Sequence, residues 1–506
     1  RGIFMKKLLA FIFCLSCFFA CGKKEQAPVS VENHQQTVTV ALAYKPKSFD
    51  PSKHTDGVTM SVTKQIYSNL FSLGEKGEIL PELAESYKIV SENTLDITLK
   101  KGILFHDGSE MKADDVIASL QRNLDSPVSH VLINPIQSMK KLNEYELEIT
   151  SNTSPNLLLH NFTHGSIAIT KEVPMNEDQV NLVGTGPFKI KLWGNGEKVE
   201  LEAFDDFYIQ KPNFQNLVFV TIPETSNRVI GLETGEIDIA YDIIPSDLSL
   251  LTEEKGLTYM SGLSFGSDFL SINTERMNDV DIRRALALAI DKKGINEAVF
   301  EGKLDLASSI LPPNVFGYSN SGIEISQNVE EAKKIMKEKG YDETHPLSLK
   351  MYIYEEPTRR QISEIIQANL KEIYMDVEVV SLEVSSFLQF TAQGQHDFLL
   401  GLWYTSSGDA DFGYYPLLHS SSKGVPGNRA FYDNKEVDQL LDDARTTSSE
   451  KQRLKDYAEV QKIIDQELPI FPLFYKTYFI GMRNHISNLV FDPRGSHILY
   501  NLQFSK

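Results

Sequence analysis

Stretches in which hydrophobic and polar residues alternate recur along the chain. They predict β-strands, because successive side chains of a strand face opposite sides, and the clearest begin near residues 38, 145 and 347. Elsewhere hydrophobic residues recur every three or four positions, which predicts helices over 282–290, 328–340, 362–373 and 451–467. This alternation of strands and helices favours α/β lobes over a helical bundle or a β-sandwich.

A strand, a tight turn and a helix are predicted in close succession between residues 95 and 124. The strand ends near Leu99, and the Asp107-Gly108 pair supplies a turn that tolerates a positive φ. Asp114 stands where a helix N-cap accepts backbone N–H groups, and hydrophobic residues follow it at helical spacing. We therefore interpret Asp114 and Asp115 as capping residues and not as a catalytic pair.

The first residues have the pattern of an export signal. Lys6 and Lys7 precede the apolar segment 8–20, which is shorter than the roughly 20 residues that a membrane-spanning helix needs. Residues 1–20 are thus predicted to be a signal peptide. The sequence Ala20-Cys21-Gly22 predicts that Cys21 is lipidated and attaches the protein to a membrane, with polar residues 21–36 as a flexible tether.

Composition narrows the class of protein further. All three cysteines lie in or beside the apolar segment, and a body without thiols fits an exported protein that avoids stray disulfides. The net charge of −19 becomes −22 when residues 1–20, with three cationic residues and no acidic ones, are removed. Nucleic-acid binding is disfavoured, because proteins of that class carry basic faces. The remaining length suffices for two or three domains.

Two short motifs suggest other chemistry. Residues 262–266 (GLSFG) have the spacing of a hydrolase nucleophile elbow, which would make the protein a periplasmic hydrolase that uses Ser264. The elbow needs a helix directly after the serine, but residues 269–272 are predicted to be extended, which favours a glycine-flanked crossing between lobes. His160 and His164 have the spacing of a metal pair on a helix, yet no third ligand is evident, so surface histidines are favoured. No metal or cofactor is predicted.

Several phrases of the sequence together resemble one family. The residues of these phrases, and the order of the phrases along the chain, are similar to those of the extracytoplasmic solute-binding proteins of peptide, dipeptide and nickel importers. The phrases are PELAES (81–86), FHDG (105–108), ADDV (113–116), VGTGPF (183–188), GLETGEIDI (231–239), DIRRALALAID (281–291), Trp403, YDNKEVDQLL (432–441) and PIFPL (469–473).

The resemblance implies a two-lobed clamp of the type II periplasmic-binding-protein kind, with an extra subdomain inserted in the first lobe. Residues 37–58, 182–265 and 475–506 would form lobe I, residues 59–181 the inserted subdomain, and residues 266–474 lobe II. The protein would be a monomer that delivers its ligand to the permease subunits of an ABC importer.

The resemblance also implies where a ligand binds. Members of the family pair with a peptide backbone near the first strand, here Ala43, Tyr44 and Lys45, and around the tryptophan phrase. Pairing of this kind tolerates many side chains, because it uses the backbone groups of the ligand. The residues of the tryptophan phrase are Gly401, Leu402, Trp403, Tyr404, Thr405 and Ser406.

Peptide-binding members carry an aspartate three residues after the tryptophan, where it neutralises the ligand's α-ammonium group. Ser406 stands at this position here, and a loop shift could bring Asp409 or Asp411 to the ligand instead. An unpaired charge in a buried cleft would cost several kcal/mol. Candidates for pairing with a ligand carboxylate are Arg228, Arg283, Arg284, Arg359 and Arg360, of which Arg283 and Arg284 are favoured as helix-surface or hinge residues.

We therefore expect an extracytoplasmic solute-binding lipoprotein that captures oligopeptides or dipeptides between two lobes. A ligand other than a standard peptide stays open, because Ser406 replaces the expected aspartate. A glutathione-like tripeptide, haem or chelated nickel would fit this change. Whether Trp403 contacts the ligand or packs the lobe core also stays open.

Overall fold

The computed structural model describes residues 37–505 apart from residues 75–76, 177–178, 322 and 324. The predicted signal peptide 1–20, Cys21 and the tether 21–36 lie outside the described residues. Within the described part of the chain, no helix combines the length and the apolar character that crossing a bilayer requires.

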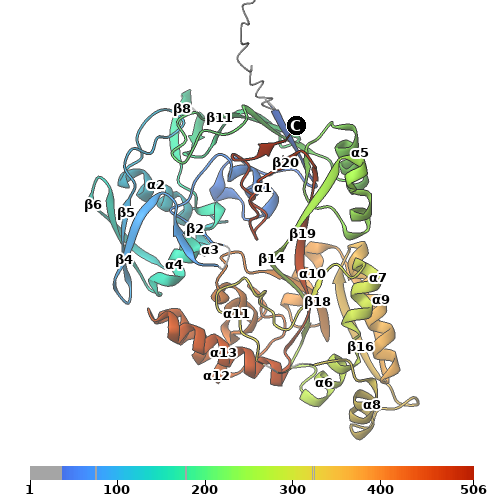
Figure 1. Cartoon of the computed structure of the whole chain (residues 1–506). Coiled ribbons are helices and arrows are strands. Elements are labelled where there is room, and N and C mark those ends of the chain that lie inside the picture. Colours follow the sequence, from blue (N-terminus) through green and yellow to red (C-terminus); the bar gives the residue numbers. More distant parts are fainter. Residues whose placement is uncertain (1–36, 75–76, 177–178, 322, 324, 506) are drawn as a thin grey trace, which may run out of the picture.

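One sheet of eleven strands runs through the molecule (Figure 1). The pairs β1–β12, β1–β13, β16–β17 and β16–β18 are parallel, and the remaining pairs are antiparallel. Across the sheet the strands are β10 (Phe188–Gly194), β11 (Lys198–Ala203), β12 (Asn216–Thr221), β1 (Thr37–Leu42), β13 (Ile239–Ala240), β19 (Ile470–Arg483), β14 (Leu257–Ile272), β18 (Phe398–Tyr404), β16 (Leu347–Tyr354) and β17 (Met375–Leu382), with β15 (Asp305–Leu306) beside β19.

Strands β14 and β19 are the longest, with 16 and 14 residues, and their two halves have different neighbours. One half of β19 pairs with β13, whereas the other half pairs with β15, and the second half of β14 pairs with β18. The pairing of β14 with β19 changes register between Leu263 and Ser267, in the GLSFG motif. These two central strands therefore join the part of the sheet that contains β13 to the part that contains β18.

Helices cover the sheet and enclose separate hydrophobic cores. A first core gathers around β1, β10, β11 and β12, and a second gathers around β16, β17 and β18. Hydrophobic residues of α5–α9 join the second core; α9 packs on β16 and β17, whereas α5 packs on β13 and β19. The helices of these regions are α1 (Gly57–Thr63), α5 (Thr225–Thr234), α6 (Val280–Ala289), α7 (Lys292–Phe300), α8 (Val329–Glu338), α9 (Pro357–Glu372) and α10 (Val384–Ala392).

Residues 70–169 contribute a third core around a sheet of four antiparallel strands in the order β4-β5-β7-β6. Figure 1 shows this region on the left of the molecule. Its elements are β2 (Phe71–Leu73), β3 (Ile79–Pro81), β4 (Ala84–Ser91), β5 (Thr94–Leu99), α2 (Ala113–Leu124), α3 (His130–Ile133), β6 (Ile136–Asn143), β7 (Glu146–Ser151) and α4 (Pro155–Asn161). Outside this region, two further sheets of two strands are formed by β8 (Lys171–Asn176) with β9 (Gln179–Val183) and by β20 (Ile486–Ser487) with β21 (Gln503–Phe504).

A fourth core lies among α11 (Ala410–Leu418), α12 (Lys435–Thr446) and α13 (Glu450–Glu467), at the bottom of Figure 1. The predicted helices correspond to α6, α8, α9 and α13. Asn328 caps α8, since its Oδ1 accepts from Glu331 N at 3.1 Å, and Gly340 follows the helix with φ +88°. The periodicity and the end signals of these helices were therefore sufficient to predict them.

The N-cap of α2 lies two residues before the predicted Asp114, although Asp115 does cap the helix as expected. Lys112 is the N-cap, and Asp115 Oδ2 accepts from Lys112 N at 2.8 Å, whereas Asp114 faces outward and pairs with Lys141. The turn before the helix is as predicted, because Gly108 has φ +84°. The carboxylate that reaches back from the third helical position does the capping here.

Two of the sequence phrases that resemble the family contact each other. His106 of FHDG donates its backbone N–H to Gly184 O of VGTGPF at 2.9 Å, and its Nε2 lies 3.0 Å from Gly186 O. Both glycines pack against the backbone at the end of α1, where a Cβ on Gly184 would lie 2.1 Å from Ile66 O. The phrases thus join the region 70–169 to the large sheet, and glycine is needed for the close approach.

Candidate functional site

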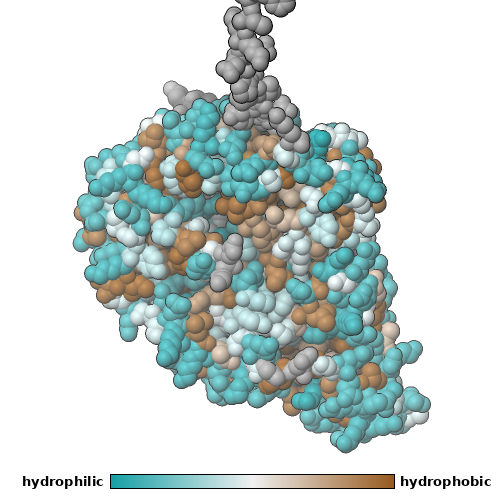
Figure 2. Space-filling model, in the orientation of Figure 1, coloured by the Kyte–Doolittle hydropathy of each residue, from teal (hydrophilic) through white to brown (hydrophobic). Residues whose placement is uncertain are grey.

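A cavity of about 640 Å³ opens where the first, third and fourth of these cores meet. Its walls include Ile480 of the first core, Leu132 of the third and Phe265 of the fourth. In Figure 2, hydrophobic residues gather around a recess in the upper middle of the molecule. Segments that are hundreds of residues apart in the sequence therefore build one site.

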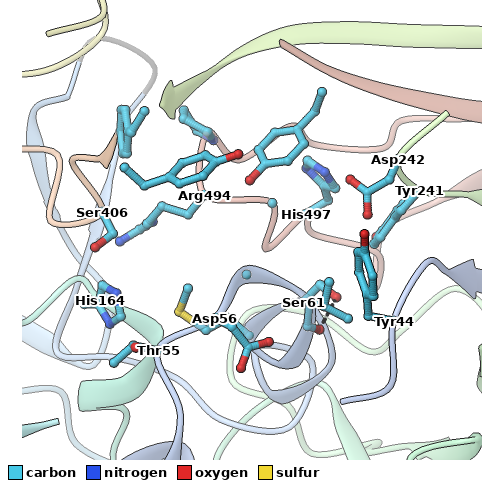
Figure 3. A pocket seen from close by; sticks show the side chains of 18 of the residues that line it. Tyr44, Thr55, Asp56, Ser61, His164, Tyr241, Asp242, Ser406, Arg494 and His497 are labelled. Atoms are coloured by element: carbon cyan, nitrogen blue, oxygen red, sulfur yellow. Dashed lines mark hydrogen bonds between the residues drawn. The ribbon is translucent and has the colours of Figure 1, made fainter. Parts of the chain in front are cut away.

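The walls of the cavity are mainly apolar and aromatic. Figure 3 shows Tyr44, Tyr241 and Asp242 on one side, and Ser406 and Arg494 on the other. The lining residues are Tyr44, Thr55, Asp56, Gly57, Val58, Met60, Ser61, Val128, Val131, Leu132, His164, Tyr241, Asp242, Phe265, Leu402, Trp403, Tyr404, Ser406, Phe412, Tyr478, Ile480, Pro493, Arg494, Gly495 and His497.

Four of the residues predicted to bind the ligand line this cavity, namely Tyr44, Trp403, Tyr404 and Ser406. Trp403 also belongs to the packing of the lobe, since its Nε1 donates to Phe412 O at 2.8 Å. The first strand and the tryptophan phrase thus come together as the resemblance implied. Contact of these four residues with a ligand stays a prediction.

The other predicted residues lie outside the lining. Ala43 and Thr405 are buried, and Thr405 N donates to Phe265 O at 2.9 Å. Lys45 pairs with Glu197 at 2.8 Å on the surface, and Gly401 packs against the Phe269 ring. None of these four residues lines the cavity.

Asp409 and Asp411 are engaged within the protein. Asp409 is fully buried, and its Oδ1 lies 2.7 Å from Nη2 of buried Arg453 and accepts from Asp411 N at the start of α11. Asp411 receives two hydrogen bonds from Arg445, at 2.7 and 2.9 Å. Neither carboxylate lines the cavity, so the loop shift that would bring one of them to a ligand is not present.

The five candidate arginines do not line the cavity either. Arg228 and Arg283 are buried and donate to backbone carbonyl groups, and Arg359 pairs with Asp268 at 3.2 Å. Arg284 is exposed, and Arg360 lies on the surface 3.7 Å from Glu364. Arg494, which no local pattern in the sequence singles out, is the arginine that reaches the cavity.

The prediction that His160 and His164 are surface histidines is wrong, because both are buried. Burial lowers the pKa of His160 to about 4 and that of His164 to about 3, so both rings are neutral at pH 7. His160 lies 3.5 Å from Asp409, and His164 Nδ1 accepts from Ser166 N. Among the described residues, no group of three side chains suited to a metal ion is found.

Ser264 lies within β14, and residues 269–272 are extended as predicted. Its hydroxyl donates to Lys476 O at 2.9 Å, and the chain continues as a strand where a nucleophile elbow would turn into a helix. The GLSFG motif is thus part of the long strand that crosses the sheet.

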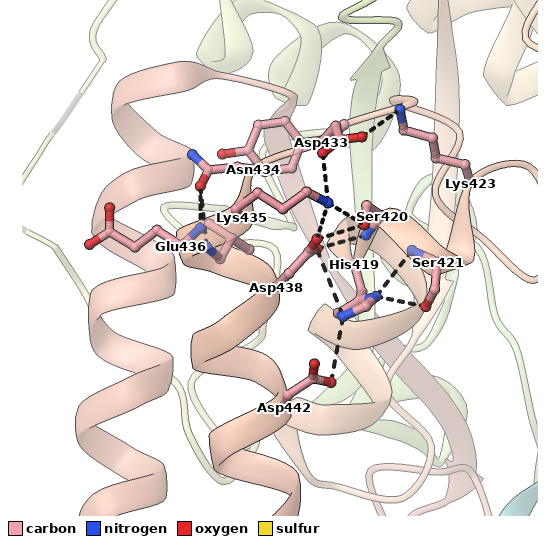
Figure 4. Close-up of polar contacts among 12 residues, drawn as sticks. His419, Ser420, Ser421, Lys423, Asp433, Asn434, Lys435, Glu436, Asp438 and Asp442 are labelled. Atoms are coloured by element: carbon pink, nitrogen blue, oxygen red, sulfur yellow. Dashed lines mark hydrogen bonds and ion pairs between the residues drawn. The ribbon is translucent and has the colours of Figure 1, made fainter.

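A second serine lies beside a histidine near the start of α12. Ser421 Oγ is 2.6 Å from His419 Nδ1, and His419 Nε2 is 3.5 Å from an Asp442 carboxylate oxygen (Figure 4). The serine amide also donates to the same Nδ1, so the contact is a local turn in which the ring accepts both groups. Asp438 accepts from Ser420 in the same cluster, which holds this turn against α12.

Three charged side chains line the cavity, and the fold supplies partners to two of them. Asp56 caps α1 by accepting from Thr59 N at 3.0 Å, and Lys47 lies 3.3 Å from its other oxygen. Arg494 donates to Thr163 O at 2.6 Å and to Asp492. Each of these two charges is therefore balanced or bonded before any ligand arrives.

Asp242 differs from the other two. Burial raises the pKa of its carboxyl group, against the opposing charge of Arg228. Arg228 donates to the backbone oxygen of Asp242 at 2.6 Å and not to its carboxylate. Within the described part of the chain, no hydrogen bond or ion pair to this carboxylate is present. Sequence reasoning missed Asp242, because no local motif distinguishes it from other acidic residues.

Known proteins resemble this chain over most of its length. The model of the bacterial extracellular solute-binding proteins, family 5 Middle, matches residues 78–425. The dipeptide-binding protein of Escherichia coli strain K12 is 25% identical over 94% of this chain and 96% of its own. Heme-binding protein A of Haemophilus influenzae is 26% identical over 96% of each chain. The solved structure of HbpA2 from Haemophilus parasuis matches 93% of this chain and 100% of its own, with TM-score 0.82 and 23% identity.

Proposed function

Because the chain belongs to family 5 of the bacterial extracellular solute-binding proteins, we propose that it captures a short peptide or peptide-like solute and delivers it to an ABC importer. The predicted fold class, an α/β clamp of two lobes, is confirmed by the similarity to solved structures of this kind. The proposed role needs no catalysis.

The observation that carries the proposal is the cavity where three cores meet. Its volume of about 640 Å³ lies within the range of small-molecule sites, roughly 300–1,000 Å³. Apolar walls with a few polar groups favour a ligand that has both side chains and polar ends. Tyr44 follows the end of β1 and Tyr404 ends β18, so strand ends from both sides of the sheet reach the cavity, as backbone pairing with a peptide requires.

We also propose the predicted organisation of the chain. Lobe I would consist of residues 37–58, 182–265 and 475–506, and lobe II of residues 266–474, with 59–181 inserted. The continuous strands β14 and β19, which pass between the first and second cores, support crossings near residues 265 and 475. A lipid on Cys21 would hold the monomeric protein at a membrane, outside the cytoplasm and near the permease.

Mass spectrometry of the natively purified protein, before and after mild denaturation, tests the proposed ligand class. A mixture of short peptides released on denaturation is the expected result. A single non-peptide species, such as haem, a nickel chelate or glutathione, would contradict the peptide proposal and leave the role of solute capture intact. Loss of the released species after exchange against excess dipeptide would show that both occupy one site.

A pair of tyrosine variants tests whether the cavity is the binding site. Tyr404 lines the cavity and is 38% exposed, whereas Tyr259 on β14 is 39% exposed and lies outside the lining. Tyr404→Ala should weaken binding of the released species about tenfold, since a large aromatic contact worth 1 to 2 kcal/mol is lost. Tyr259→Ala is the matched control and should change the affinity less than about twofold in calorimetry. Equal effects of the two variants would place the site elsewhere.

A further inference from the structure

The carboxyl group of Asp242 lines the cavity, and no described residue donates a hydrogen bond to it or forms an ion pair with it. The other charged lining residues, Asp56 and Arg494, have partners within the protein. Ser406 and the histidines of the lining contribute no negative charge. A cationic group inside the cavity would therefore have Asp242 as its available counter-charge.

The backbone at Asp242 is held in an unusual conformation. Its φ of +55° lies in the left-handed region, which aspartate tolerates better than most residues. Arg228 is buried and donates to Asp242 O at 2.6 Å and to Ile222 O and Pro223 O at 2.7 Å each. A guanidinium group bound to three carbonyl oxygens thus fixes the turn that presents the carboxylate, and strain of this kind is common at binding sites.

The surroundings of Asp242 would strengthen an ion pair with a ligand. Tyr241, Tyr404 and Tyr478 lie near it; burial raises the pKa of each hydroxyl group, and the charge of Asp242 adds to this effect. Aromatic walls exclude water, so a carboxylate and a cation attract each other more strongly there than in solution. Tyrosine faces also attract cations through their ring electrons. Figure 3 shows Asp242 beside Tyr241 and above Tyr44 at the cavity wall.

We propose that Asp242 is the specificity-determining residue that binds a primary ammonium group of the ligand. The inference rests on the proposed function and identifies which end of the solute the site recognises. An ammonium group can come from the amino end of a peptide or from a lysine side chain. Both sources would place a nitrogen with three N–H donors against the carboxylate, which receives no hydrogen bond from the described residues.

Binding of four synthetic peptide pools to the purified protein tests the proposal. The pools contain peptides of two to five residues, with a free or an acetylated amino end, and either with or without lysine. The wild-type protein should bind the free-amino pools more tightly than the acetylated pool without lysine, by on the order of thirtyfold, since an ion pair in a cavity is lost. If acetylation matters only when lysine is absent, the site accepts either source of the ammonium group.

Asp242→Asn retains the size and the left-handed tolerance of the side chain but removes its charge. This variant should lose the preference for free amino ends. It should bind the free-amino pool without lysine about thirtyfold more weakly than the wild type does, whereas its affinity for the acetylated pool without lysine should change little. The matched control is Asp247→Asn, which removes a charge from the neighbouring 3-10 helix (Pro245–Leu250) outside the cavity and should stay within about twofold of wild type.

The outcomes separate the two proposals. If the wild-type protein binds none of the pools, the peptide function fails. If it binds them but Asp242→Asn keeps the full preference for free amino ends, the function stands and the role of Asp242 is overturned. A wild-type protein that binds free and acetylated lysine-free pools equally would also overturn that role, and this comparison does not depend on the folding of a variant.

Discussion

Asp409 and Arg453 form an ion pair that is closed off from water. Their side chains are 0% and 1% exposed, and the two groups are 2.7 Å apart. Arg453 Nη2 also lies 3.0 Å from Tyr457 Oη, and Asp409 begins α11, which lies directly after the tryptophan phrase. A residue that the sequence offered as a ligand contact therefore stabilises the loop that carries the cavity residues.

Removing one partner of this pair should destabilise the protein strongly. We expect Arg453→Met to lower the free energy of unfolding by roughly 3 to 5 kcal/mol, because the Asp409 carboxylate would remain buried without a counter-charge. Lys45→Met is the control, because its ion pair with Glu197 is exposed and should contribute less than about 1 kcal/mol. Urea denaturation followed by circular dichroism measures both; similar small losses would contradict the expectation.

The buried histidines should make stability depend on pH. Burial lowers the pKa of His396 to about 4, from about 6.5 in the unfolded chain. As the pH falls, the histidine of the unfolded chain binds a proton before that of the folded protein does. The free energy of unfolding is therefore not reduced by this group above pH 6.5, and it decreases as the pH falls from 6.5 toward 4. Each such histidine can change the free energy of unfolding by at most about 1.4 kcal/mol per pH unit.

His396→Gln should reduce this dependence. The amide can still donate to Arg429 O, to which His396 Nε2 now lies at 2.7 Å, but it takes up no proton. Between pH 7 and 5, the variant should lose less unfolding free energy than the wild-type protein, by up to one proton's share of the slope. An unchanged slope in urea titrations at several pH values would show that His396 does not contribute.

At the scale of elements, the VGTGPF segment passes unusually close to α1. Gly186 N donates to Ile66 O and Phe188 N to Gln65 O, both at 2.9 Å, and the segment is also bonded to His106. A Cβ at Gly184 would meet the Ile66 carbonyl oxygen at 2.1 Å. The glycine is required by backbone packing between two regions, which explains its place in a phrase that the family shares.

Gly184→Ala should therefore push the segment away from α1 and lower the free energy of unfolding by about 1 to 3 kcal/mol. A suitable control is Gly74→Ala, where the added methyl group would meet the flexible end of the Glu78 side chain and not backbone. The control should cost less than about 1 kcal/mol. Thermal unfolding followed by calorimetry compares the two, and a tolerated Gly184→Ala would mean that the segment can shift freely.

At the scale of the whole molecule, the cavity depends on three cores staying together. A ligand favours the closed arrangement only by its greater affinity for that arrangement, so it must contact more than one core. The lining residues Leu132, Phe265 and Ile480 satisfy this condition, since each belongs to a different core. In the proposed organisation of the chain, the long strands β14 and β19 connect the two lobes, which would rotate about them.

We expect the protein to become more compact when it binds its solute. Small-angle X-ray scattering with and without the species identified by mass spectrometry should show a smaller radius of gyration in the bound state. The Tyr404→Ala variant, at a concentration of ligand that saturates only the wild type, should remain extended. Unchanged dimensions at saturation would mean that capture does not involve closure.

Local patterns determined much of the architecture. Helices such as α8 and α13 follow from periodicity and end signals within about twenty residues, and the family phrases identified the overall fold. Tyr44 and Trp403, which were predicted to bind the ligand, both line the cavity, and their contact with a ligand stays a prediction. These features could be predicted because the interactions that produce them, or the sequence motifs that indicate them, involve residues that lie close together in the chain.

Tertiary structure decided which charges are free. Asp409 and its partner Arg453 are 44 residues apart, and Arg494 reaches Thr163 across 331 residues. Contacts between residues that are far apart in the sequence also bury His160 and His164, and they leave the Asp242 carboxylate without a hydrogen bond from the described residues. No local pattern could predict either feature. The sequence by itself determined the elements and the family, whereas the fold determined which acidic group stays unpaired in the cavity, because pairing depends on neighbours that no local pattern specifies.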